Sequence, residues 1–200
     1  MMERAAYSGL DRLLHRVAFD EVFHGIALQR ALAELEDGLV ARKIEAVAPS
    51  APPVFVTALP RAGTTLVLNL LARVPGFASH TYRDMPFLLA PLLWGRLSRP
   101  FRKSASEAER AHGDGVMVGY DSPEAFEEVL WLAFWRDKYH ADRIEPWTAD
   151  DRDPEFESFF NRHIAKLLAA RAAERDGPPP NRYLSKNNAN IARLGLLPEL

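Results

Sequence analysis

The sequence predicts a helix-rich α/β fold with a parallel sheet, and three patterns in its 200 residues support that prediction. An apolar, β-branched run at 54–57 leads through a short loop into the apolar helical stretch 66–74. A helix is expected from 153 to about 175, and a second buried strand follows it at 182–186. Strands that alternate with helices in this order favour a parallel sheet covered by helices.

The composition fits a single domain over 1–200, because 48% of the residues are hydrophobic. The formal net charge of −2 comes without a basic block, which argues against a nucleic-acid partner. The chain has no cysteine, and its six histidines lack zinc-like spacing, so we expect no metal. No run approaches the roughly 20 apolar residues of a membrane span, so a cytoplasmic protein is expected.

The first element expected is a long helix over 20–47, which the proline-rich stretch 49–53 ends. Leucines recur in it at helical spacing and define the expected apolar face, with Glu36 among the solvent-side residues. The leucines are Leu28, Leu32, Leu35 and Leu39. Residues 1–48 are therefore interpreted as a helical extension, and the core of the domain begins at residue 54.

The chain between the two strands is expected to be mostly helical. A short extended piece after residue 76 is followed by a turn near Asp84 and by an apolar helix, and the polar, glycine-bearing stretch 99–120 is expected to be irregular. Residues 122–124 and 153–155 both show the cap, proline and acid of a helix start. The acids that follow the first start are interpreted as a first-turn acid and a solvated face, with acceptor binding as the alternative; they are Glu124, Glu127 and Glu128.

Two clear strands are few for an α/β sheet. The chain also ends at Leu200, where such a fold would begin its next strand. We therefore expect an N-terminal portion of a larger fold, whose C-terminal part is absent. An incomplete sheet would leave an exposed edge, which favours self-association.

The clearest chemistry lies in the loop after the first strand, Pro60-Arg61-Ala62-Gly63-Thr64-Thr65. A glycine there lets backbone N–H groups approach an anion at the positive end of a helix. The threonine hydroxyls add donors, and Arg61 adds a planar charged fork suited to phosphate or sulfate oxygens. The strand–loop–helix order predicts a P-loop-like three-layer fold. The loop lacks the GK[ST] ending of loops that bind a Mg²⁺-bound triphosphate, so we expect it to bind a different anion. The plainer alternative is an ordinary helix start with Thr64 and Thr65 as caps.

This loop resembles the 5′-phosphosulfate-binding loop of sulfotransferases that use 3′-phosphoadenylyl sulfate (PAPS), whose signature is P-[KR]-[SA]-G-T-[TS]. The stretch Tyr183-Leu184-Ser185-Lys186 is similar to that family's strand ending in a lysine. The loop arginine makes the resemblance closest to the bacterial and Golgi-type branch. The resemblance implies a nucleotide-binding core from residue 54. It also implies metal-free transfer of a sulfuryl group from PAPS to a hydroxyl or amine of a carbohydrate, lipid-linked or peptide acceptor.

The resemblance also implies roles for individual residues. The loop from Pro60 to Thr65 would hold the phosphosulfate, with Arg61 beside it, and Lys186 would bridge the sulfuryl group and the leaving oxygen. Asn188 stands where the cytosolic branch has its catalytic histidine, and an amide cannot accept the proton. The predicted base is Asp84, about twenty residues past the loop, with His80 as the runner-up. Asp84 fits a helix N-cap equally well.

Two functions of other classes stay open at this point. A P-loop kinase-like phosphotransferase would use the same strand–loop–helix, although its GK[ST] ending is missing. A catalytically incomplete fragment would bind a nucleotide or a partner without turnover, because the family's 3′-phosphate site follows a strand that this chain does not reach.

Overall fold

The computed structural model of this chain describes residues 25–44, 49, 51–99, 108–109, 117–118, 122–174 and 177–200. The strands are β1 (Val54–Val56), β2 (Phe77–Ala78), β3 (Ala108–Glu109), β4 (Met117–Val118) and β5 (Arg182–Lys186). The α-helices are α2 (Gly25–Ile44), α3 (Thr64–Leu71), α4 (Pro91–Ser98), α5 (Glu128–Leu132) and α6 (Pro154–Ala172). Short 3₁₀ helices are η2 (Tyr82–Asp84), η4 (Arg136–Lys138), η5 (Ala149–Asp151), η6 (Asn188–Arg193) and η7 (Leu197–Glu199).

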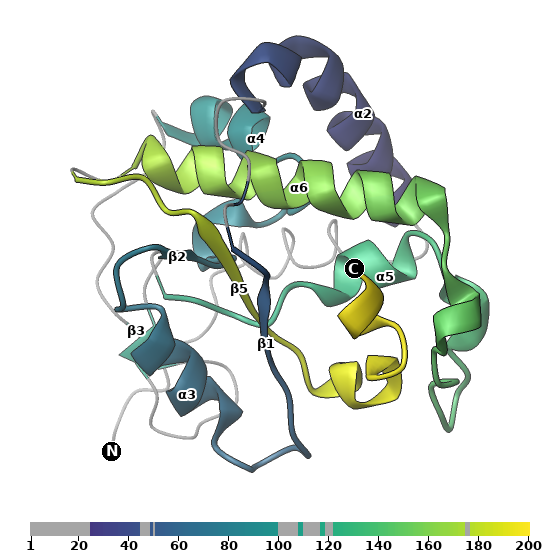
Figure 1. The fold of residues 1–200 in the computed structure, drawn as a ribbon. Coiled ribbons are helices and arrows are strands. Elements are labelled where there is room, and N and C mark those ends of the chain that lie inside the picture. Colours follow the sequence, from purple (N-terminus) through teal and green to yellow (C-terminus); the bar gives the residue numbers. More distant parts are fainter. Residues whose placement is uncertain are drawn as a thin grey trace, which may run out of the picture.

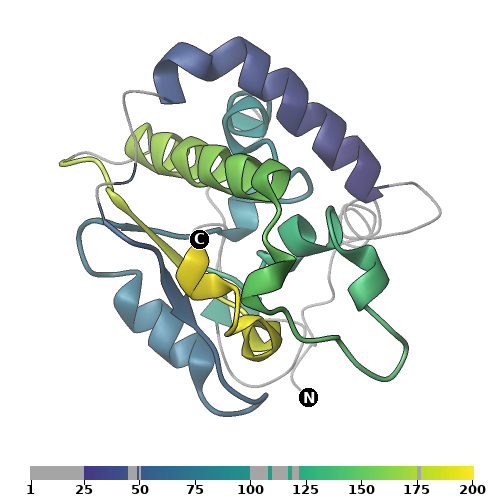
Figure 2. The same cartoon turned by 45° about the vertical axis from the view of Figure 1, so that its right-hand side comes forward.

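A parallel sheet with the strand order β1-β5-β2 forms the centre of the fold. The middle strand, β5, pairs Lys186 with Val56 of β1 and Tyr183 with Ala78 of β2. Helix α3 packs against β1 and β5, and α6 packs against β2 and β5. Figures 1 and 2 show these two helices on opposite sides of the strands. The predicted α/β class with a parallel sheet is therefore confirmed, and all three strands end at one edge.

The start of α6 follows from the residues at 153–155, as the sequence predicts. The Asp153 carboxylate accepts hydrogen bonds from the N–H groups of Glu155 at 2.8 Å and Phe156 at 3.3 Å. The helix then buries Phe156 and Phe160 completely. The Phe160 ring meets Tyr183 of β5 edge-on, with 6.1 Å between the ring centroids. A capped start and one aromatic face thus place α6 on the sheet.

Helix α2 is held to α6 by a buried charge cluster rather than by its leucines. The Lys166 ammonium of α6, 1% exposed, lies 2.7 Å from Asp37 Oδ1 and 3.3 Å from Glu36 Oε2. The expected apolar face of this helix is therefore wrong, because Glu36 is fully buried while Leu35 and Leu39 are 54% and 67% exposed. A buried lysine is stable only beside a carboxylate, and the inward face of α2 supplies one together with the buried side chains of Val40 and Ile44. Residues 1–24 and 45–48 of the predicted extension lie outside the described residues.

The predicted helix start at 122–124 is also wrong. Pro123 forms an isolated antiparallel bridge with Thr81, and the Glu124 N–H donates to the carbonyl oxygen of His80 at 3.0 Å. This extended segment lies beside the chain that follows β2, so α5 begins only at Glu128. Strands β3 and β4 pair antiparallel inside the stretch expected to be irregular. No helix in the described part of the chain is long and apolar enough to cross a membrane.

Candidate functional site

The anion loop, by which we mean residues 58–65, follows β1 at the carboxyl edge of the sheet and includes the first two residues of α3. Arg61 and Gly63 both have left-handed backbones, with φ of 69° and 80°. A left-handed backbone costs a side-chain-bearing residue about 1–2 kcal/mol, and such strain clusters at ligand-binding sites. An added Cβ on Gly63 would meet nothing within 4 Å, so its φ rather than crowding requires the glycine. The loop is thus exposed and strained.

The amino end of α3 forms the floor of this loop. The Gly63 carbonyl accepts hydrogen bonds from Leu66 N–H at 2.9 Å and Val67 N–H at 3.2 Å, which starts the helix. Among the described residues no side chain caps this end, so Thr64 is not the cap that the plainer sequence alternative supposes. Helix α3 therefore presents its amino end, the positive end of its dipole, to the exposed loop.

The segment after β5 is bonded to the residues just before the anion loop and to Thr64 within it. The Thr57 hydroxyl donates to the Asn188 carbonyl oxygen at 3.3 Å, and the Thr64 hydroxyl donates to Asn188 Oδ1 at 3.3 Å. The Asn187 N–H donates to the Val56 carbonyl oxygen at 3.0 Å. Lys186 pairs in register with the last residue of β1. The structure therefore brings the loop and the end of the lysine strand together, although the bonded residues Thr64 and Asn188 lie 124 positions apart in the sequence.

Behind β5, the Glu127 carboxylate forms the centre of a buried polar cluster. It is 1% exposed and accepts hydrogen bonds from Tyr183 Oη at 3.0 Å and from Trp131 Nε1 at 2.9 Å. Asn190 Nδ2 also donates to it, at 3.4 Å. The interpretation of these acids as a solvated face is therefore wrong for Glu127. The signal in the sequence is the apolar run that follows directly, because it turns this part of the helix into the core.

Glu128 ties the residue after Lys186 to the fully buried Arg193. Its carboxylate accepts from Arg193 Nη2 at 2.9 Å and from the Asn187 side-chain amide. Burial alone would raise the pKa of Glu128, but Arg193 and the neutral donors hold that pKa below its ordinary value. The Arg193 guanidinium stacks over Trp131, 4.3 Å from the ring centroid. Arg193 is not among the predicted site residues, and it holds Glu128, which in turn binds Asn187 after the end of β5.

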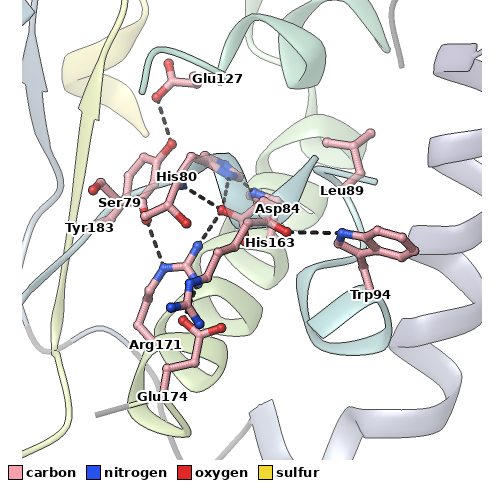
Figure 3. A network of polar contacts seen from close by, with 12 residues as sticks. Ser79, His80, Asp84, Leu89, Trp94, Glu127, His163, Arg171, Glu174 and Tyr183 are labelled. Atoms are coloured by element: carbon pink, nitrogen blue, oxygen red, sulfur yellow. Dashed lines mark hydrogen bonds and ion pairs between the residues drawn. The ribbon is translucent and has the colours of Figure 1, made fainter. Parts of the chain in front are cut away.

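The predicted base, Asp84, lies in a different and buried polar network (Figure 3). Its Oδ2 atom accepts from the Thr81 N–H at 2.8 Å, pairs with Arg171, and lies 3.4 Å from His80 Nδ1. Arg171 also donates to the Ser79 carbonyl oxygen at 3.1 Å, which anchors the end of β2 to α6. Burial alone would raise the pKa of Asp84, but Arg171 and His80 hold that pKa well below its ordinary value.

These contacts speak against Asp84 as a general base. A general base needs a pKa near the working pH and a path to the acceptor's proton, whereas Asp84 is 3% exposed and ion-paired. It is not an N-cap either, because Thr81 is the N-cap of η2 and Asp84 completes the capping box at the third position. His80, the runner-up, is equally buried, and its Nε2 lies 3.0 Å from Nε2 of His163.

One comparison with known proteins gives a match. The family model described as "Sulfotransferase family" matches residues 52–200, which is about three quarters of the chain. The match begins just before β1 and contains the anion loop, the Asp84 network and the end of β5, while α2 lies before it. Neither the curated proteins nor the solved structures give a match.

Proposed function

The chain belongs to the sulfotransferase family, and on that premise we propose that it uses PAPS to sulfate a hydroxyl or amine of a carbohydrate, lipid-linked or peptide acceptor. One observation carries the proposal: Asn188 bonds the anion loop to the segment that directly follows Lys186. The arginine in the PRAGTT loop supports the bacterial and Golgi-type branch.

The donors of the loop fit a phosphosulfate. The amino end of α3 offers backbone N–H groups, and Arg61 and Lys186 offer positive charge from two separate strand ends. Residues 58–65 contain no carboxylate that would repel an anion. The proposed ligand is therefore a phosphosulfate rather than the Mg²⁺-bound triphosphate of a kinase-like protein, since the GK[ST] ending is absent.

In the proposed mechanism, the acceptor oxygen or nitrogen would form a bond to the sulfur of PAPS while the bond between that sulfur and the 5′-phosphate oxygen breaks. The nucleotide 3′-phosphoadenosine 5′-phosphate would leave, and the acceptor's proton would pass to solvent. Arg61 and the N–H groups of Gly63 and Thr64 bind the anionic oxygens and orient them toward the acceptor. The Lys186 ammonium stabilises the negative charge that develops on the leaving oxygen. Removing one such preorganised donor lowers an enzyme's rate by about 10²–10³.

For Asp84 we propose a structural role in place of the predicted base. Asp84→Asn separates the two roles. If Asp84 has a structural role, the variant protein is less stable, so its urea midpoint should fall while kcat at neutral pH stays within about threefold of wild type. A large loss of kcat together with loss of the acid limb of the pH–rate profile would instead support Asp84 as the general base.

Calorimetry with the product 3′-phosphoadenosine 5′-phosphate (PAP) tests the nucleotide assignment. We expect PAP to bind without Mg²⁺ and ATP to bind more weakly, with or without Mg²⁺. Tighter, Mg²⁺-dependent ATP binding would contradict the proposal and favour the kinase-like alternative. Mass spectrometry of acceptors incubated with PAPS then tests transfer. PAP binding without sulfation of any acceptor would favour the binding fragment.

Self-association and a cytoplasmic location stay proposals. β1 is an edge strand of the described sheet, and Leu66 and Leu70 of α3 are 64% and 55% exposed near it. Exposed strand edges and apolar side chains favour association. Sedimentation across a concentration series tests this proposal, and an unchanging monomer would contradict it.

A further inference from the structure

We propose that Asn188 acts as a positioning residue that holds the anion loop in its ligand-binding shape, and this inference rests on the proposed function. Asn188 makes two different bonds to the loop region. Its main-chain carbonyl accepts from Thr57, just before the loop, and its side-chain Oδ1 accepts from Thr64, at the start of α3. One residue at the start of η6, distant in the sequence, thus joins the residue before the strained loop to the start of α3.

The loop is a segment that a clamp can stabilise, because its backbone is strained. Arg61 is held in a left-handed conformation, and inside the loop the Ala62 N–H donates to the Leu59 carbonyl oxygen at 3.3 Å, the same length as each bond to Asn188. Fixing the backbone of a residue costs about 1–2 kcal/mol of conformational entropy. A loop already ordered through its ends binds its ligand without that ordering cost, and affinity rises accordingly.

The clamp also divides the roles of the loop's hydroxyl groups. Thr64 is 7% exposed, and its hydroxyl gives its single proton to Asn188 Oδ1. That proton is then not available to the anion, so Thr64 contributes its backbone N–H alone. The prediction that its hydroxyl donates to the anion is replaced by a positioning role.

A double-mutant cycle in urea tests the clamp without any nucleotide. Thr64→Val and Asn188→Ala each remove the same side-chain bond, so each should lower the unfolding midpoint and the pair should lower it little further. Thr57→Val is the matched control, because its hydroxyl bonds the main-chain carbonyl, which Asn188→Ala retains. Thr57→Val and Asn188→Ala should therefore be additive. Additive effects of Thr64→Val and Asn188→Ala would overturn the clamp.

Asn188→Asp separates positioning of the anion from stability. The variant keeps an oxygen acceptor for Thr64 and places a negative charge at the amino end of α3, which the helix dipole favours, so the urea midpoint should stay or rise. The same charge repels PAP, so its Kd should rise about tenfold, and more at low salt. Asn188→Ala should weaken PAP about threefold and lower the midpoint as well.

The role of Asn188 and the proposed function can each be contradicted without the other. An Asn188→Asp variant with wild-type Kd for PAP at low salt would overturn the placement of Asn188 beside the anion. A wild-type protein that does not bind PAP at all would overturn the proposed function, and the urea cycle would still decide whether the clamp exists.

Discussion

The two polar regions around the carboxyl edge of the sheet are built in opposite ways. The part of the anion loop from Pro60 to Gly63 is exposed and carries two left-handed residues. The network around Asp84 is buried, and Asp84, His80, His163 and Arg171 are each at most 3% exposed. The exposed residues of the loop are accessible to a ligand, whereas the network turns the Arg171 guanidinium and the Thr81 N–H onto the Asp84 carboxylate.

On the proposed function, exposure rather than residue type separates the arginine that binds a ligand from the arginine that holds the fold. Both regions contain an arginine whose guanidinium suits an oxyanion. Arg171 already holds the Asp84 carboxylate and the Ser79 carbonyl oxygen, so it is an internal strut between α6 and the segment after β2. Arg61 has no such buried carboxylate partner among its neighbours in the anion loop. Substitutions in the Asp84 network should therefore lower stability, whereas substitutions in the anion loop should lower ligand binding and activity.

The largest effect is expected from Arg171→Met. It leaves the Asp84 carboxylate buried without its main partner, and the free energy of unfolding should fall by about 3–5 kcal/mol. Urea unfolding followed by circular dichroism measures this. Adding Asp84→Asn should recover part of the loss, because the uncompensated charge is gone. A loss below about 1 kcal/mol would show that the network does not hold the fold.

Arg61→Asn should give the next largest effect, on activity alone. Asparagine tolerates the left-handed backbone, so the unfolding midpoint should hardly move, while the loss of the cation lowers kcat/KM by about 10²–10³. Sulfation of an accepted substrate is the measurement. Arg61→Lys keeps the charge but loses the planar fork, and we expect it to fall between the two. A clear fall in the unfolding midpoint of Arg61→Asn, alongside the lower kcat/KM, would contradict the contrast between the two regions.

The buried network should also make stability depend on pH. Burial, followed by His80 and Lys166, holds the pKa of His163 well below its ordinary value of 6.5, so the folded side chain stays neutral. The unfolded histidine takes a proton below about pH 6.5. The free energy of unfolding therefore has its full value above that pH and falls as the pH decreases, by up to about 1.4 kcal/mol per pH unit.

Urea unfolding between about pH 5 and 8 tests this dependence. His163 faces His80 after β2, Asp84 of η2 and Lys166 of α6, so those groups stay unchanged in the test variant. His163→Gln should flatten the slope between about pH 5 and 6.5. Asp84 adds a separate acid limb, since its lowered pKa keeps its contribution intact above its ordinary 3.8 and loses it only at lower pH. A wild-type stability independent of pH would contradict the assignment for His163.

The smallest effect is expected from Gly63→Ala. The added methyl group meets no atom, so the cost is that of a left-handed alanine, about 1 kcal/mol of unfolding free energy. Because the backbone then favours another shape, PAP binding should weaken by about tenfold or more, although no donor has been deleted. Gly177→Ala is the matched control, since it carries the same kind of strain at φ 126° outside the anion loop. Equal weakening of PAP binding by both variants would contradict a local role for Gly63.

Several features could be predicted from the sequence because neighbouring residues determine them. The strand, loop and helix around the PRAGTT motif follow from a β-branched run, a glycine and an apolar stretch. The start of α6 follows from Asp153 and Pro154, whose cap and fixed φ act within one turn. The family resemblance rests on the same local motifs, and the family is confirmed over residues 52–200.

The tertiary structure alone decided which charged groups are buried and therefore what they do. The partner of Asp84 lies 87 residues away, and that of Lys166 lies on a helix whose leucines suggested another face. A buried charge is stable only beside its partner, and such a partner comes from whichever distant segment the fold places there. Local pattern therefore determined where the anion loop is. Long-range pairing decided that Asp84 and Glu36 are buried beside Arg171 and Lys166, and that Asn188 of η6 bonds to Thr64 of the loop.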